Sequence, residues 1–260
     1  MNIKRLSFFQ RIGIWRTIFE IFLVGVILFV VFHHFPRKPV VSSWYSKIVY
    51  EVPVSKKLVA LTYDDGPYPV DTLKILKLLD KYHVKATFFM IGKQMEENPE
   101  VVKMVLDGGH VIGNHTYTHP AKLETYPTAQ IVGEIDRCEQ VIEKMTGKRA
   151  QLFRPPLGLV NSQIASVAKD EGYHTILWTV CGDHHDAPTP QLMAKRVFKV
   201  IRPGGIILIH DGRYPDRWKD VIATDIIVKT LLKQGYHFVT VPQLLEQESK
   251  WPSRHTHSLL

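Results

Sequence analysis

The sequence predicts an α/β protein with a mostly parallel sheet and crossover helices, either an open doubly wound sheet or a closed barrel. Three observations lead to this prediction. Short apolar runs of strand length recur along the chain, segments of helical period lie between them, and Gly or Pro residues mark their ends. With 260 residues, 45% of them hydrophobic, the chain suffices for one sizeable domain and an appendage.

Seven apolar runs have the length and composition of buried strands. Along the chain they span residues 58–62, 86–91, 110–114, 152–154, 174–178, 206–210 and 237–239.

Helical segments separate these runs. Residues 71–82 and 128–145 each carry apolar residues on one helical face. Asn98 before Pro99 predicts a helix that starts at the proline and is capped by the asparagine side chain. Helices are expected to stop at four glycines, Gly108, Gly147, Gly172 and Gly235.

Residues 1–35 are expected to form a basic cytoplasmic end and a signal anchor. The apolar run 21–32 is too short to span a bilayer, and the longer segment 12–35 includes Arg16 and Glu20. A cleaved signal peptide and a buried amphipathic helix are the alternatives. Basic residues before the run predict a single-pass protein of the cell membrane with its body outside, or a secreted protein if the segment is cleaved.

The rest of the chain divides into three parts. Residues 36–54 hold three prolines and two adjacent serines and are expected to be a linker. Residues 55–248 form the predicted domain, and residues 249–260 a flexible tail.

Charge and cysteine content exclude several classes of protein. The formal net charge is +8, but basic residues among the first 38 supply most of it, so the domain lacks the basic face of a nucleic-acid binder. Cys138 and Cys181 are too few for a disulfide framework and lack the spacing of a zinc knuckle. Whether they pair stays open.

Polar residues follow the predicted strands, where parallel α/β folds expose functional groups. Asp64 and Asp65 follow the first strand, and a turn there can bring both carboxylates to one opening. His115 and His119 follow the third strand, and their spacing lets both imidazoles meet one ion if the segment coils. Each pair alone is also explained by turn formation or by chance pairing in a chain with 13 histidines.

Three further segments supply candidates. Arg154 is followed by two prolines that fix its direction, which suits orienting a carboxylate. His210 ends the sixth strand and is either a functional histidine or a core histidine bonded to a carbonyl. The loop after the fifth strand offers candidates to line a cleft, namely Trp178, Asp183 and Asp186.

In order and spacing, five segments resemble the polysaccharide deacetylases of the NodB-like family, also called carbohydrate esterase family four, across residues 58–245. They are TYDDGP (62–67), HTYTH (115–119), FRPPLG (153–158), WTVCGDHHD (178–186) and IILIHDG (206–212). The resemblance implies a distorted, incomplete (β/α)7-type barrel.

The resemblance also implies roles. Asp65, His115 and His119 match the family's metal triad, for one divalent ion, with zinc first and cobalt or another ion as alternatives. Asp64 matches the catalytic base and Arg154 the residue that orients it. The remaining matches are His210 as the catalytic acid and, on the substrate and oxyanion side, Pro156, the backbone amide of Leu157, and Trp178.

Three departures from the family pattern stand out. Tyr63 replaces the usual Phe, and Leu157 stands where the family often has an aromatic residue. The histidines at 184 and 185 replace an Asp-Trp pair, which leaves open whether Asp183 or Asp186 orients His210.

The expected function is hydrolysis of N-acetyl groups from a polysaccharide such as peptidoglycan or a chitin-like glycan, releasing acetate. One alternative is an O-acetyl esterase on acetylated hemicellulose. The other is a catalytically silent carbohydrate-binding protein of the envelope, whose mark would be loss of a base, ligand or acid. None of these residues is lost.

Overall fold

The computed structural model describes residues 48–183, 185–212 and 217–248. Nine strands of this part form one sheet in which neighbouring strands pair in parallel. The strands are β1 (Ile48–Val49), β2 (Leu58–Asp64), β3 (Thr87–Met90), β4 (Val111–Asn114), β5 (Leu152–Phe153), β6 (His174–Ile176), β7 (Val180–Cys181), β8 (Ile206–His210) and β9 (His237–Val239).

The sheet curls into a half-barrel. Its order is β1-β6-β5-β4-β3-β2-β8-β7, and β9 pairs with the start of β2. Glu51 follows β1 and forms an antiparallel bridge with Gly205, which precedes β8. Strand β1 stands at one end of the strand order and β8 near the other, so this bridge joins the two ends of the curled sheet. This arrangement is consistent with the predicted (β/α)7-type barrel.

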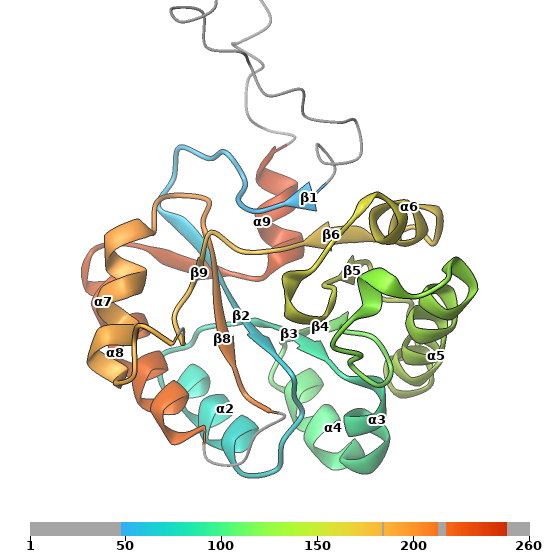
Figure 1. Cartoon of the computed structure of the whole chain (residues 1–260). Coiled ribbons are helices and arrows are strands. Elements are labelled where there is room, and N and C mark those ends of the chain that lie inside the picture. The colour runs from blue at the N-terminus through green and yellow to red at the C-terminus, as the bar shows by residue number, and fades with distance from the viewer. Residues whose placement is uncertain (1–47, 184, 213–216, 249–260) are drawn as a thin grey trace, which may run out of the picture. The chain divides into compact units, whose positions relative to one another are not determined.

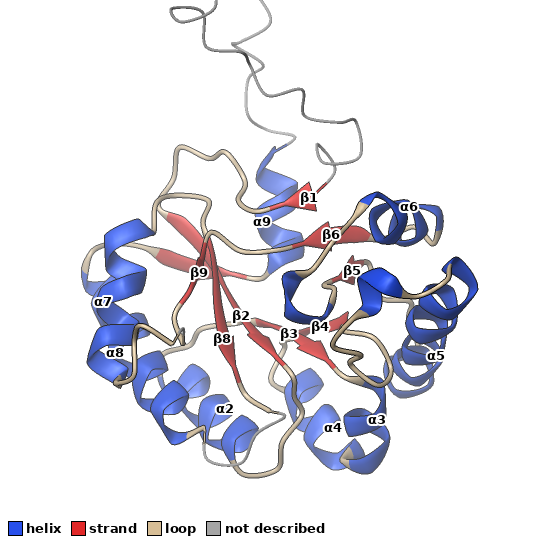
Figure 2. Cartoon of the chain, in the orientation of Figure 1, coloured by secondary structure: helices blue, strands red, loops and turns tan. Residues whose placement is uncertain are grey.

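Helices lie around the outside of the strands (Figures 1 and 2). They are α2 (Asp71–Lys81), α3 (Gly92–Glu97), α4 (Pro99–Asp107), α5 (Thr128–Thr146), α6 (Ser162–Asp170), α7 (Pro190–Val200), α8 (Trp218–Lys233) and α9 (Val241–Glu248), with 3-10 turns at Leu123–Thr125 and Pro156–Gly158. Helix α9 differs in position, because Val241 and Leu244 pack with Ala60 and Ile206 in a core cluster inside the curl.

The two-residue period of the strands sorts side chains between an inner and an outer core. On β2, Ala60 belongs to the inner cluster and Leu61 to the larger cluster beneath the helices. Asp64 lies four residues after Ala60, and His210 four residues after Ile206, which is also in the inner cluster. Both polar side chains therefore point toward the inside, and they are register partners on neighbouring strands.

The seven predicted strands all form, with ends within two residues of those predicted. Strands β1 and β7 were not predicted, since two residues carry no periodicity. The prediction that Asn98 caps the next helix is wrong: its Nδ2 donates to Gln94 O (2.9 Å) at the end of α3, although α4 does begin at Pro99.

The predicted linker differs from the structure in its last residues. Ile48 and Val49 form β1 and pair with β6. Val52 is buried, and its N–H donates to Gly204 O (2.9 Å). The domain thus starts before residue 55, because these residues bury apolar surface against it.

Among the described residues, no helix has both the length and the apolar character that crossing a bilayer requires. The predicted anchor (12–35) and tail (249–260) lie outside the described residues.

Candidate active site

Asp65, His115 and His119 converge at the carboxyl ends of β2 and β4. The Oδ1 atom of Asp65 lies 3.1 Å from His119 Nε2 and 3.5 Å from His115 Nε2. All three ligand atoms lie within 4.8 Å of one another, and all three side chains are buried. The sequence prediction that these residues share a site agrees with this placement.

Backbone conformation brings the three ligands together. Asp65 adopts φ 73°, Thr116 φ 66° and His119 φ 56°, left-handed values that cost non-glycine residues energy. At Asp65 this breaks the strand alternation, so its carboxylate turns to the same side as that of Asp64. Strained residues that cluster this way are typical of functional sites.

The side-chain atoms of the triad suit a divalent cation. His115 Nδ1 lies 2.7 Å from Arg154 O and so donates to it, which leaves the lone pair on Nε2 to face Asp65. Among the described residues, no hydrogen-bond donor satisfies the buried Asp65 Oδ1. Two imidazole nitrogens and one carboxylate are common ligands for zinc and similar ions.

Asp64 lies beside this triad and is held by Arg154. Arg154 Nη1 donates to Asp64 Oδ1 (2.6 Å) and to Thr62 Oγ1 (2.9 Å). Its Nε and Nη2 donate to the carbonyl oxygens of Ile176 (3.1 Å) and Leu177 (2.9 Å). The other carboxylate oxygen of Asp64 is 3.7 Å from His115 Nε2 and faces the triad.

His210 forms a separate pair with Asp183. The distance from His210 Nδ1 to Asp183 Oδ2 is 2.6 Å, and Arg217 Nη1 donates to the same oxygen at 3.0 Å. Burial alone would lower the pKa of His210, but the carboxylate of Asp183, with Asp64 and Asp65, raises it to about 9. The imidazole is therefore charged at neutral pH.

The structure distinguishes the two acids that the sequence left open. Asp183 contacts His210, whereas Asp186 accepts from Arg196 Nη1 (2.6 Å) of α7. Asp183 is therefore the acid positioned to orient His210.

Asp64, His210 and the three residues of the triad line a cavity of about 170 Å³. Leu157 lines it and is 53% exposed, and the preceding residue, Pro156, is buried. Trp178 also lines the cavity and packs so closely on Gly158 that a Cβ there would lie 2.4 Å from the indole. Two of the three substrate-side candidates, Leu157 and Trp178, thus line the cavity, whereas Pro156 does not.

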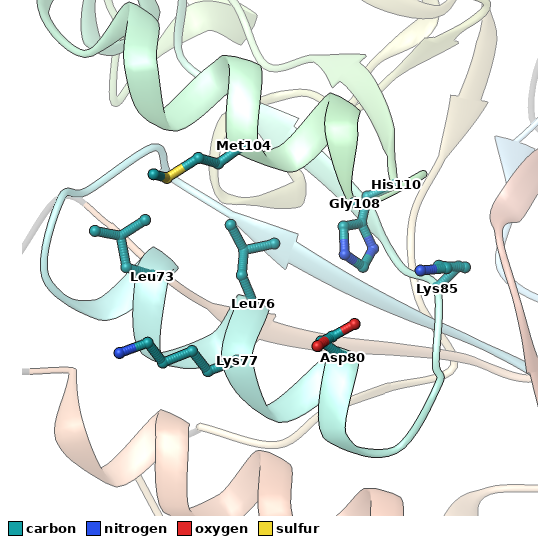
Figure 3. A pocket seen from close by; sticks show the side chains of 8 residues that line it. All are labelled: Leu73, Leu76, Lys77, Asp80, Lys85, Met104, Gly108 and His110. Atoms are coloured by element: carbon teal, nitrogen blue, oxygen red, sulfur yellow. The ribbon is translucent and has the colours of Figure 1, made fainter.

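A larger cavity of about 480 Å³ lies between α2 and α4. Leu73 and Leu76 face Met104 across it, with His110 and Lys85 at one side (Figure 3). None of the predicted site residues lines it, so its size does not make it the active site.

Two acids that were not singled out from the sequence make contacts close to the candidate site. Glu134 on α5 accepts from the backbone N–H of Tyr117 (3.1 Å) and of Thr118 (2.8 Å), between the two histidine ligands. Asp211 accepts from Thr72 Oγ1 (2.7 Å), and burial raises its pKa to about 7. Only the position of Asp211 directly after His210 offered a sequence signal for either residue.

A parallel α/β half-barrel with an Asp–His–His triad that could hold a metal ion, a buried carboxylate held by arginine and a histidine paired with an aspartate is an arrangement typical of a hydrolase. The chain belongs to the polysaccharide deacetylase family: the family model described as "Polysaccharide deacetylase" matches residues 51–176, and a relative at 41% identity matches 76% of the chain. A peptidoglycan-N-acetylglucosamine deacetylase of Bacillus cereus is 41% identical over 200 residues, covering 76% of this chain and 92% of that protein. The protein is accordingly an enzyme that hydrolyses carbon–nitrogen bonds.

Other relatives differ in the sugar they are named for. The peptidoglycan-N-acetylmuramic acid deacetylase PdaC of Bacillus subtilis is 36% identical over 192 residues, which cover 74% of this chain and 39% of that protein. A solved peptidoglycan N-acetylglucosamine deacetylase, in complex with an N-oxidanyl-benzamide compound, superposes with a TM-score of 0.74 at 32% identity, covering 78% of this chain and 95% of that one.

Proposed function

We propose that this enzyme hydrolyses the N-acetyl groups of peptidoglycan, foremost on its N-acetylglucosamine units, and releases acetate. The observation that carries the proposal is the convergence on one cavity of the Asp65–His115–His119 triad and two acid–base candidates, Asp64 and His210. The names of the relatives in Bacillus cereus and Bacillus subtilis support peptidoglycan as the glycan.

Each residue has a role in this reaction. A divalent ion bound by the triad, zinc foremost and cobalt or another ion as alternatives, would supply Lewis-acid activation of water and of the acetyl carbonyl. Asp64 is oriented by Arg154 and takes the proton of the attacking water. His210 gives a proton to the departing amine, and the backbone N–H of Leu157 donates to the developing oxyanion.

The state of His210 supports an amide substrate over an ester. An amine leaves poorly unless it is protonated, so an amide hydrolase needs a strong proton donor on the leaving-group side. Asp183 holds His210 in its charged form well above neutral pH. An alcohol leaving group from an acetylated hemicellulose needs this donor less. A silent binding protein would need neither the buried Asp64–Arg154 pair nor the charged histidine.

The location of the enzyme is part of the same proposal. A membrane-tethered domain outside the cell would meet peptidoglycan directly, and a secreted form would do the same. The support is the basic and apolar order of residues 1–35.

Acetate release from the full-length protein tests the proposal. Peptidoglycan, N-acetylglucosamine oligomers and acetylated xylan are incubated with enzyme after chelator treatment, and then with added zinc or cobalt. We expect chelator treatment to stop acetate release from the N-acetylated glycans and added metal to restore it. Asp64→Asn should reduce the restored rate by about 100-fold or more while still binding metal. Release from xylan alone, or full activity of Asp64→Asn, would overturn the proposal.

A further inference from the structure

A second group of metal-ligating side chains lies next to the triad and has no role in the reaction as a group. It comprises Cys181, Asp183 and His210, whose ligand atoms all lie within 4.8 Å of one another. Cys181 Sγ is 3.4 Å from Asp183 Oδ1, and Asp183 Oδ2 is 2.6 Å from His210 Nδ1. Strands β7 and β8 bring them together, because they end in Cys181 and His210 and pair in parallel.

The chemistry of this group differs from that of the triad. A thiolate, an imidazole and a carboxylate together suit zinc, and the soft sulfur disfavours magnesium and calcium. Cys181 is half-buried and lines the catalytic cavity, so an ion in the cavity can reach its sulfur. The other cysteine, Cys138, lies on the buried face of α5 and is fully buried. Any cavity-facing thiolate ligand among the described residues therefore comes from Cys181.

We propose that Cys181, Asp183 and His210 form a second zinc site whose occupation inhibits the enzyme. Binding would displace the proton of the Cys181 thiol and the proton that His210 Nδ1 donates to Asp183, and both protons would pass to solvent. With zinc at Nδ1 and its carboxylate partner engaged, His210 is no longer the charged acid. The inhibition rests on the proposed function, which gives His210 this task, whereas the binding does not.

The two sites should fill in order. Arg217 Nη1 lies 3.0 Å from Asp183 Oδ2 and repels a cation there, and the ion must also break the hydrogen bond between Asp183 and His210. The triad has no such obstacle, because no donor occupies Asp65 Oδ1 among the described residues. Activity is therefore expected to rise with the first equivalent of zinc and to fall as more is added.

Cobalt reports the second site directly. Cobalt bound to a thiolate absorbs in the near ultraviolet by sulfur-to-metal charge transfer, and the Asp65–His115–His119 site contains no sulfur. Full-length, chelator-treated protein is titrated with cobalt, using wild type, Cys181→Ser and Cys138→Ala as the matched cysteine control. The band should appear after the first equivalent in wild type and Cys138→Ala and be absent from Cys181→Ser. A wild type without the band, or a Cys181→Ser variant that keeps it, would overturn the site.

Zinc inhibition of acetate release tests the consequence. Each variant is compared with its own maximal rate, so a change in basal activity does not enter. Excess zinc should slow wild type by about tenfold or more and leave Cys181→Ser near its maximum. Equal inhibition of both would overturn the inhibitory role. A cobalt band in a protein with no deacetylase activity under any metal condition would overturn the proposed function, and the inhibition with it, while the binding site would stand.

Discussion

Arg154 offers the most direct test of how the base is held. The side chain is fully buried, and its four hydrogen bonds link three strands of the half-barrel. The acceptors are Asp64 Oδ1, Thr62 Oγ1, Ile176 O and Leu177 O.

The Arg154→Met substitution would leave the carboxylate of Asp64 buried without its cation. Removing one partner of a buried ion pair costs about 3–5 kcal/mol of stability. Asp64→Asn keeps an acceptor for the guanidinium and should cost about 1–2 kcal/mol. Because the double variant has neither charge to bury, it should be more stable than the sum of the single losses predicts, by about 1–3 kcal/mol.

Chemical denaturation of the chelator-treated protein measures these free energies. Chelation matters because a bound ion stabilises the folded state by linkage and would mask differences between variants. Lys103→Met is a suitable control, since its partner Asp107 is exposed on the same helix and the pair should contribute less than about 1 kcal/mol. An Arg154→Met variant as stable as the control variant, or single losses that simply add, would refute the reasoning.

Three further substitutions probe the site. Asp183→Asn should lower the pKa of His210 from about 9. Because the catalytic acid must be protonated, activity in the pH–rate profile should begin to fall about one to two pH units lower than in wild type. An unchanged pH–rate profile would contradict the pairing of Asp183 with His210. Gly212→Ala places a Cβ 2.2 Å from Asp65 O and should weaken metal binding about tenfold or more in a calorimetric titration. Gly133→Ala is the control, because a Cβ at that position has no atom within 4 Å, and this variant should bind metal as wild type does. Glu134→Gln should also weaken metal binding by about tenfold, because the turn between His115 and His119 loses a charged acceptor; unchanged affinity would limit Glu134 to a structural role.

The sequence was sufficient to predict which polar side chains gather at one edge of the sheet, for a physical reason. Parallel strands expose their carboxyl ends at one edge, so polar residues after apolar runs collect there. Asp64 and His210 follow this rule and lie opposite one another in register. Strand periodicity also predicts the inward direction of both side chains once the strand ends are known.

Periodicity could not predict the conformations that complete the triad. Asp65 and His119 have positive φ without being glycine, and tertiary contacts must hold them there. One such contact is Gly212, whose missing side chain makes room for the Asp65 carbonyl. Burial of Arg154 likewise depends on acceptors from β2 and from the end of β6. Glu134 reaches the histidine turn from α5, 16 residues beyond Thr118 in the sequence.

The choice of Asp183 as the partner of His210 shows how packing resolves an ambiguity of sequence. Gly182 follows β7, and a Cβ at this position would lie 2.6 Å from the side chain of Ile209, so the chain passes close against β8. The next residue, Asp183, therefore reaches His210, whereas Asp186 already lies beside Arg196 of α7. The departure from the family pattern at positions 184 and 185 comes after this close approach. Because the close approach depends on Gly182, a larger residue there should separate Asp183 from His210 even though both catalytic-site residues remain in the sequence.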